Sequence, residues 1–184
     1  DAWVGSMAWS PDASRIYFVA EDKGASPIYS LSLAANVQGG GQGKNATNPR
    51  RVVRYEQVLQ GFNDDLAITL RGTKLLFTRM SLQSPNEIYS AASPIVSSTN
   101  TGSTRITGNI SIGGGAVPGV QQLTHVNDTV LSQVLMSSLE PFWFDGANGD
   151  KVEGFLVKPP NFDASKKYPV KFLIHGGPQG AWGD

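Results

Sequence analysis

Short alternating runs of apolar and polar residues, separated by turn-forming residues, fill the first 138 positions of the 184-residue chain. This two-residue period predicts β-strands, and no window shows the sustained 3.6-residue apolar period of an amphipathic helix. Similar runs recur at a spacing of about 60 to 71 residues. The repeated pairs are 15–18 with 74–77, 27–30 with 87–90, and 51–53 with 122–124. The sequence therefore predicts two β-units of one design.

Each predicted unit has the pattern of a propeller blade, a small sheet that presents one face to each neighbour. Because two blades cannot cover all of their own apolar faces, we expect further blades before residue 1. The turn Ser10-Pro11-Asp12 leads into the strand of the first unit. Aromatic residues at strand spacing are expected to pack between blades. They are Trp9, Tyr17, Phe18, Tyr29, Phe77 and Tyr89.

The pattern changes after residue 138, where we place a domain boundary. Segments 141–145 and 151–157 flank the turn residues 146–149 and predict a hairpin. A linker over 161–168 then leads to residues 170–174, whose nearly continuous apolar character predicts a buried strand of a sheet covered on both faces.

Composition limits the function classes. Fifteen basic and fifteen acidic side chains cancel, so no basic patch favours binding of nucleic acid or of an anionic membrane surface. No apolar stretch approaches the roughly 18 residues of a membrane-spanning helix. The chain has no cysteine, which excludes disulfides and thiol catalysis. We expect no metal and no cofactor, since no cluster shows the spacing of metal ligands.

The segment His175-Gly176-Gly177-Pro178 directly follows the predicted strand 170–174 and carries the clearest chemical signal. A hydrolase that attacks a carbonyl needs N–H donors about 3 Å from the developing oxyanion, and paired glycines let the backbone approach that closely. Pro178 has no N–H, and it favours an extended conformation at the residue before it. Gly177 is therefore the predicted oxyanion donor, with Gly176 and His175 shaping the loop.

The segments FLIHGGPQGAWGD, WSPDASRIYF and QQLTHVND resemble the prolyl oligopeptidase family of serine peptidases. The resemblance is strongest to its acylaminoacyl-peptidase branch, which includes the secreted dipeptidyl-peptidases V of fungi. It extends over essentially the whole chain. It implies β-propeller blades over residues 1–138, followed by the start of an α/β-hydrolase domain over 139–184.

The resemblance also implies the chemistry. No Gly-x-Ser-x-Gly occurs in the chain, and the α/β-hydrolase order Ser, Asp, His places the whole triad after the oxyanion loop. We therefore interpret the chain as an internal fragment of a secreted serine exopeptidase that releases dipeptides from short peptides. The alternatives are an acylaminoacyl peptidase or esterase on the same scaffold, and a propeller binding module with an inactive hydrolase half. The oligomeric state is left open.

Three N-glycosylation sequons begin at Asn45, Asn109 and Asn127, and two of them lie in or beside stretches rich in Gly, Ser, Thr and Asn. Exposed loops of this kind can carry glycans, which favours a secreted, extracellular protein. Two other features are assigned no catalytic role. His125 is interpreted as a solvated or hydrogen-bonded structural residue, and the adjacent acids Asp64 and Asp65 should point to opposite faces of a strand.

Overall fold

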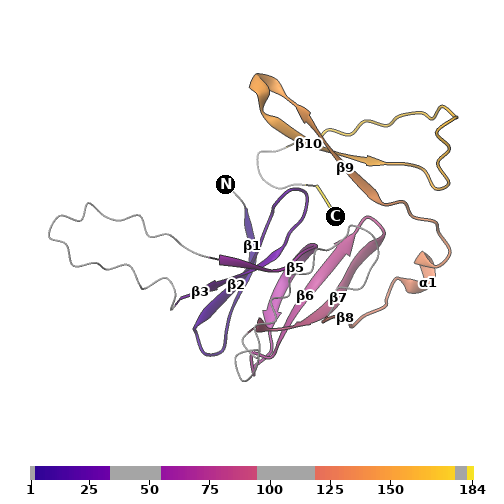
Figure 1. Ribbon diagram of the computed structural model, residues 1–184. Coiled ribbons are helices and arrows are strands. Elements are labelled where there is room, and N and C mark those ends of the chain that lie inside the picture. The colour runs from indigo at the N-terminus through magenta and orange to yellow at the C-terminus, as the bar shows by residue number, and fades with distance from the viewer. Residues whose placement is uncertain (1–2, 34–54, 95–118, 177–181) are drawn as a thin grey trace, which may run out of the picture.

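The computed structural model describes residues 3–33, 55–94, 119–176 and 182–184. Antiparallel β-sheet dominates these residues, and the helices among them are one turn of α1 (Asp128–Leu131) and the short η3 (Ala147–Gly149). The sheets are arranged in three groups (Figure 1). No helix in the described part of the chain is long and apolar enough to cross a membrane.

Two four-stranded sheets form the predicted pair of β-units. The first has the order β1-β2-β3-β4, with strands Val4–Trp9, Arg15–Ala20, Ile28–Ser32 and Tyr55–Leu59. The second has the order β5-β6-β7-β8, with strands Phe62–Ile68, Lys74–Ser81, Ser84–Ala92 and Val120–Gln122. In both sheets every strand pairs antiparallel with the next along the chain, as in a propeller blade. We call them blade A and blade B.

The sequence repeat corresponds to equivalent strands. Segments 15–18 and 74–77 lie in β2 and β6, the second strand of each blade, and residues 28–30 and 87–90 lie in β3 and β7. Of the third pair, residues 51–53 lie outside the described residues, whereas Gln122 ends β8. The prediction of two similar β-units is confirmed.

The two blades pack face to face around one apolar core. Its buried members from blade A are Tyr17, Val19, Ile28 and Leu59, and those from blade B are Leu66, Leu75, Phe77 and Ala91. Tyr17 and Ile28 have no exposed surface, and Phe77 is 1% exposed. Full burial of one such side chain contributes about 1.5–3 kcal/mol, so this contact is a main source of stability.

The contact uses different faces of the two blades. In the repeat, Phe18 of β2 corresponds to Phe77 of β6. Phe77 and its cross-strand partner Tyr89 lie on the face of blade B that meets blade A. Phe18 pairs with Tyr29 on the opposite face of blade A from Tyr17, because successive residues of a strand alternate. The blades therefore pack front to back, as successive blades of a propeller do.

The predicted packing of Trp9 between blades stays a prediction. Trp9 is 55% exposed and takes no part in the contact between blades A and B. Its neighbour Ala8 packs against the core instead, so Trp9 lies on the face of blade A that is turned away from blade B. Tyr17 and Phe77 are buried between the blades as predicted, and Tyr89 packs against the same core. Tyr29 is buried and Phe18 partly buried on the opposite face of blade A.

Polar contacts between the blades fix their register. The Tyr17 hydroxyl and the Ser93 hydroxyl lie 3.0 Å apart in the core. The Leu66 N–H donates to Ser6 Oγ at 3.0 Å, which joins β5 to β1. Because a buried polar group without a partner is costly, these pairs favour one relative position of the two sheets.

A partly buried arginine stabilises the connection from β4 to β5. Arg79 Nε donates to Asn63 Oδ1 at 2.9 Å, and Arg79 Nη2 donates to the Gln60 carbonyl at 2.7 Å. The guanidinium also lies over the rings of Phe77 and Tyr89, at 5.3 and 5.5 Å from their centroids. Burial lowers the pKa of Arg79 from its ordinary value.

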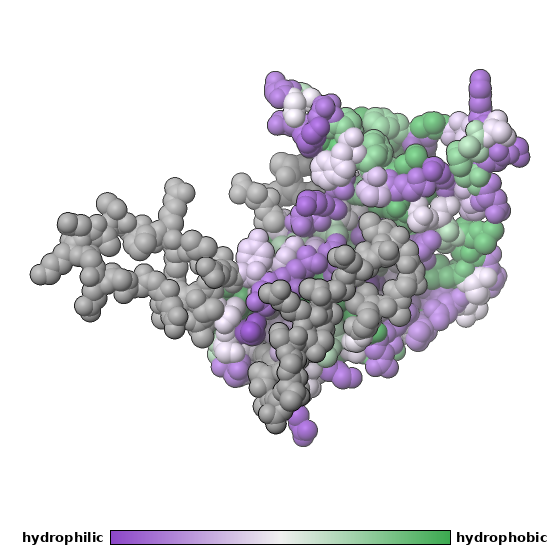
Figure 2. Space-filling model, viewed as in Figure 1, coloured by the Kyte–Doolittle hydropathy of each residue, from purple (hydrophilic) through white to green (hydrophobic). Residues whose placement is uncertain are grey.

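The predicted hairpin is also confirmed. Strands β9 (Leu139–Asp145) and β10 (Lys151–Val157) pair antiparallel around the turn that contains η3, in which Asn148 has φ 60°. Apolar side chains gather over this hairpin (Figure 2) and remain about half exposed. The largest are Phe142 at 46%, Trp143 at 51% and Phe144 at 47%.

The prediction of a buried strand over residues 170–174 was wrong. These residues form no strand, and the apolar side chains of Val170, Phe172, Leu173 and Ile174 are 61–87% exposed. A strand exists only where neighbouring strands satisfy its N–H and C=O groups, and no described strand pairs with this segment. The start of a hydrolase sheet and the boundary near residue 138 both stay predictions.

The buried Tyr17–Ser93 hydrogen bond provides a test of the blade contact. Tyr17→Phe should lower the free energy of unfolding by about 1–2 kcal/mol, because it leaves the buried Ser93 hydroxyl without this partner. A double-mutant cycle with Ser93→Ala, measured by urea unfolding, should give a coupling energy of about 0.5–1.5 kcal/mol. Tyr55→Phe is the control, since Tyr55 is 59% exposed. A coupling energy of zero would contradict the contact.

Candidate functional site

The residues of the predicted oxyanion loop are described only in part. His175 and Gly176 are exposed and lie in irregular structure, whereas Gly177 lies outside the described residues. A Cβ built at Gly176 meets no heavy atom within 4 Å. The backbone here is open to solvent, as an approaching substrate requires. The role of Gly177 as an amide donor stays a prediction.

The two ends of this segment lie close together. The His175 and Trp182 rings meet edge to face, with their centroids 5.0 Å apart and an interplanar angle of 86°. Such an edge-to-face arrangement is a favoured geometry for a ring pair. His175 therefore has a structural contact consistent with the loop-shaping role predicted for it.

Beyond Trp182 the chain returns to the blades. The Asp184 N–H donates to the Gly24 carbonyl at 2.8 Å, and Asp184 Oδ1 accepts a hydrogen bond from the Leu82 N–H at 2.5 Å. Gly24 lies in the turn between β2 and β3, and Leu82 lies in the turn between β6 and β7. Each turn joins the second and third strands of its blade, so one residue contacts equivalent positions on blade A and blade B. We call these two turns the blade rim.

The hairpin and the connector before it reach the same rim. A Cβ at Gly24, which has φ +66°, would lie 2.2 Å from the Phe155 ring of β10. Gln83 Nε2 donates to the Met136 carbonyl at 3.5 Å. Burial and the nearby charge of Asp22 raise the pKa of Glu153 on β10. The C-terminal part of the described chain therefore reaches one rim of the blade pair, where Phe155 of β10 and residue Asp184 both lie against Gly24.

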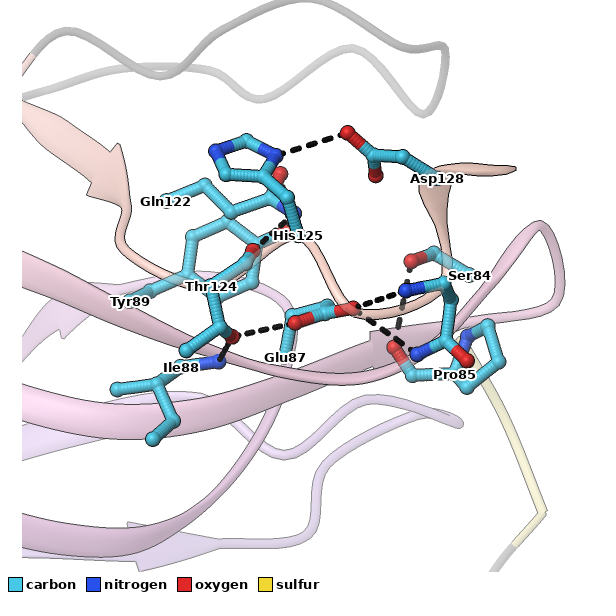
Figure 3. A network of polar contacts seen from close by, with 10 residues as sticks. Ser84, Pro85, Glu87, Ile88, Tyr89, Gln122, Thr124, His125 and Asp128 are labelled. Atoms are coloured by element: carbon cyan, nitrogen blue, oxygen red, sulfur yellow. Dashed lines mark hydrogen bonds and ion pairs between the residues drawn. The ribbon is translucent and has the colours of Figure 1, made fainter. Parts of the chain in front are cut away.

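The connector between blade B and the hairpin is held by a buried carboxylate (Figure 3). Glu87 of β7 is only 3% exposed. Its Oε1 accepts hydrogen bonds from the Asn127 N–H at 3.0 Å and from Asn127 Nδ2 at 2.9 Å. Its Oε2 accepts a short hydrogen bond from the Thr124 hydroxyl. Donors to the ionised form stabilise the charge and lower the pKa of Glu87, with Thr124 contributing most.

The same network includes the other residues that the sequence singled out. Thr124 Oγ1 also accepts from the Ile88 N–H at 2.8 Å, and the Tyr89 hydroxyl donates to Gln122 Oε1 at 3.1 Å. His125 Nδ1 lies 3.0 Å from Asp128 Oδ2, and both side chains are about 60% exposed. His125 is thus an exposed, hydrogen-bonded loop residue, as predicted.

The remaining predicted positions are distributed as follows. Asn127 stands at the N-cap position of α1, but its side-chain amide donates to Glu87 and makes no capping hydrogen bond. Asn45 and Asn109 lie outside the described residues. Asp64 and Asp65 lie at a β-bulge of β5, where Asp65 has φ 51° and accepts a hydrogen bond from the Thr78 hydroxyl at 3.0 Å. No group of three acidic, histidine or cysteine side chains in the described segments could hold a metal ion.

Sequence reasoning missed Glu87, Arg79 and Asp184. The two-residue alternation along β7 does place Glu87 on the same face as Tyr89 and Ala91, which face blade A. That period was the available signal for its burial. The hydrogen-bond partner of the Asp184 carboxylate, Leu82, is 102 positions away and has no local signature.

The described residues form a blade-like antiparallel β-protein in which His175 and Gly176 are exposed and connect through Trp182 to the blade rim. No family model matches the chain. Curated proteins do match it. The chain is 29% identical over 181 residues to "Probable dipeptidyl-peptidase 5" of Arthroderma benhamiae and to "Dipeptidyl-peptidase 5" of Arthroderma otae. Each alignment covers 97% of this chain and 20% of the relative.

A shorter segment is more similar still. Over 48 residues, 26% of this chain, the identity to "Dipeptidyl-peptidase 5" of Schizosaccharomyces pombe is 56%, and the segment is 7% of that protein. The chain thus spans about a fifth of the length of the relatives that it matches along most of its sequence. These similarities support a dipeptidyl-peptidase relationship.

The Glu87 network gives a pH prediction. Because its folded-state pKa is lowered, Glu87 should contribute stability that is present above the ordinary glutamate pKa and is lost as the pH falls through the lowered value. Glu87→Gln should therefore destabilise the protein at neutral pH, and the difference from wild type should shrink in acid. Thermal unfolding across pH 2–7 measures this, with the exposed Glu56→Gln as control. A difference that is constant with pH would contradict the assignment.

Proposed function

We propose that this chain is part of a secreted serine exopeptidase that releases dipeptides from peptide N-termini. The observation that carries the proposal is the similarity over 97% of the chain to proteins named dipeptidyl-peptidase 5. The His175-Gly176-Gly177-Pro178 sequence adds a chemical reason, since it has the residue types of an oxyanion loop. Short peptides are the proposed substrates.

The proposed architecture is a β-propeller followed by an α/β-hydrolase domain of the prolyl oligopeptidase type. The front-to-back contact of the two blades supports the first part, because it leaves an equivalent face of blade A for another blade. The exposed apolar side chains of segments 141–144 and 170–174 support the second part, because exposed apolar surface of this kind is typically covered by further structure.

The proposed mechanism is acyl transfer. A serine outside this chain attacks the scissile carbonyl. A histidine takes the proton of the serine hydroxyl and gives it to the leaving amine, and an aspartate orients that histidine. The Gly177 N–H, together with the N–H after the serine, would stabilise the tetrahedral oxyanion. The propeller would restrict access to short peptides.

The first experiment is an activity comparison with the full-length protein. We expect it to cleave an aminoacyl-Ala anilide and to release the dipeptide, with little turnover of a simple acyl ester. Preference for the ester would favour an esterase on the same scaffold. The absence of both activities, together with no Gly-x-Ser-x-Gly in the residues after Asp184, would favour a binding module with an inactive hydrolase half.

The oxyanion assignment predicts the effect of substitutions at Gly177. Gly177→Pro removes the backbone N–H and should reduce kcat about 10²- to 10³-fold in the full-length enzyme. Gly177→Ala retains the N–H and is the matched comparison, with an expected loss well below that of the proline variant. Steady-state kinetics with the anilide substrate measure both. Near wild-type kcat for Gly177→Pro would overturn the assignment.

The secreted location predicts N-linked glycans. Enzymatic deglycosylation of the natively expressed protein should reduce its mass, and site-resolved mass spectrometry should find glycans at Asn45 and Asn109. We expect lower occupancy at Asn127, because its Nδ2, the atom that a glycan modifies, already donates to the buried Glu87. A protein without any glycan would contradict the secreted location. Full occupancy at Asn127 would show that modification precedes formation of the Glu87 contact.

A further inference from the structure

The turn between β9 and β10 contains the one Asn-Gly pair of the 184-residue sequence, Asn148-Gly149. This pair lies at the tip of the hairpin (Figure 1), where the residues from Ala147 to Asp150 are all exposed. Asn148 has φ 60° and ψ 15°, and Gly149 has φ 81°. The turn therefore needs two residues that accept a positive φ, which explains why asparagine and glycine stand here.

The same pair has a reactivity that depends on the second residue. The backbone nitrogen of Gly149 can attack Cγ of the Asn148 side chain and close a five-membered imide ring. In other sequences the side chain of the following residue hinders this attack, and glycine has none. A Cβ built at Gly149 meets no heavy atom within 4 Å, so the space around this residue is open as well.

The reacting groups are held weakly. The Gly149 N–H donates to the Gly146 carbonyl at 3.4 Å, which is long for a hydrogen bond. Among the described residues, none forms a hydrogen bond with the Asn148 side chain. At a ψ of 15° the Gly149 nitrogen lies near the Asn148 nitrogen and away from Cβ, so ring closure requires rotation about the Cα–C bond of Asn148. An exposed turn opens locally at little cost, which permits this rotation.

We propose that Asn148 is a site of spontaneous deamidation, a reaction that needs no reactant other than water. The Gly149 nitrogen loses its proton and forms a bond to Cγ of Asn148, and the side-chain amide nitrogen leaves as ammonia. Water then adds to one of the two imide carbonyls and breaks its bond to the ring nitrogen. Cleavage at the side-chain carbonyl gives aspartate. Cleavage at the main-chain carbonyl gives isoaspartate, in which the backbone runs through Cβ.

Both products disturb the hairpin. Each adds a negative charge to a turn that Asp145 and Asp150 already flank. Isoaspartate also lengthens the backbone of the turn by one carbon, which disturbs the register of the adjacent pair Asp145 and Lys151. Because β10 carries Phe155 against Gly24 of blade A, a weakened hairpin should loosen this contact too. The modification therefore acts on the described contact between the hairpin and the blades.

The test follows deamidation in the full-length protein under native conditions. Samples are incubated at mildly alkaline pH and digested at mildly acidic pH, and mass spectrometry detects the replacement of an amino group by a hydroxyl group. Asn161 is the matched internal control, since it is exposed and has φ 57° but precedes Phe162. We expect Asn148 to convert at least about tenfold faster than Asn161, because glycine leaves the attacking nitrogen unhindered. Equal rates, or no conversion at Asn148, would overturn the proposal.

A variant separates the modification from its consequence. Asn148→Gly retains a residue that accepts a positive φ but has no side-chain amide, so its peptide should keep its mass. After incubation, hydrogen exchange in β9 and β10 of the wild type should accelerate several-fold, whereas the variant should exchange as it did before. An isoaspartyl methyltransferase should label the wild-type peptide that contains position 148. Unchanged hydrogen exchange after full conversion would overturn the effect on the hairpin.

Discussion

The front-to-back contact between blade A and blade B is the constraint on which the rest of the structure depends. Phe77 of blade B and Tyr17 of blade A meet in one core, although these residues are not equivalent in the repeat. A contact between different faces of similar units does not close on itself after two copies. Such units either continue as an array or close into a ring, and a propeller is the closed form.

Polar groups convert this apolar contact into one defined geometry. Apolar surfaces alone tolerate sliding, because burial of area has no direction. The Tyr17–Ser93 and Leu66–Ser6 hydrogen bonds have directional requirements and join the two blades in or beside the core. A shift of one sheet against the other would leave these groups without partners. The turns that contain Gly24 and Leu82 are consequently held near each other. This proximity allows Asp184 to contact both turns.

The sequence predicted what depends on local pattern. The predictions of strands, of two similar β-units and of the hairpin over 141–157 were correct, because alternation and turn residues act over a few positions. The buried strand at residues 170–174 was mispredicted, since burial depends on which sheet covers a face. The contacts of Glu87 with Thr124 and Asn127 span 37 and 40 positions, and that of Asp184 with Leu82 spans 102. Single side chains with such distant partners leave no periodic signal.

The exposed residues His175 and Gly176 show why contacts with distant residues matter. Backbone amides stabilise an oxyanion only when they are held in place before the charge develops, and glycine pairs are the least restrained backbone available. An added Cβ at Gly176 would meet no heavy atom within 4 Å, so packing does not restrain this residue. The described contacts nearest to it come from residues further along the chain: the His175 ring contacts Trp182, and Asp184 hydrogen-bonds to both blades. A segment without local packing is therefore connected to the blade pair through single side chains and backbone groups rather than through a core.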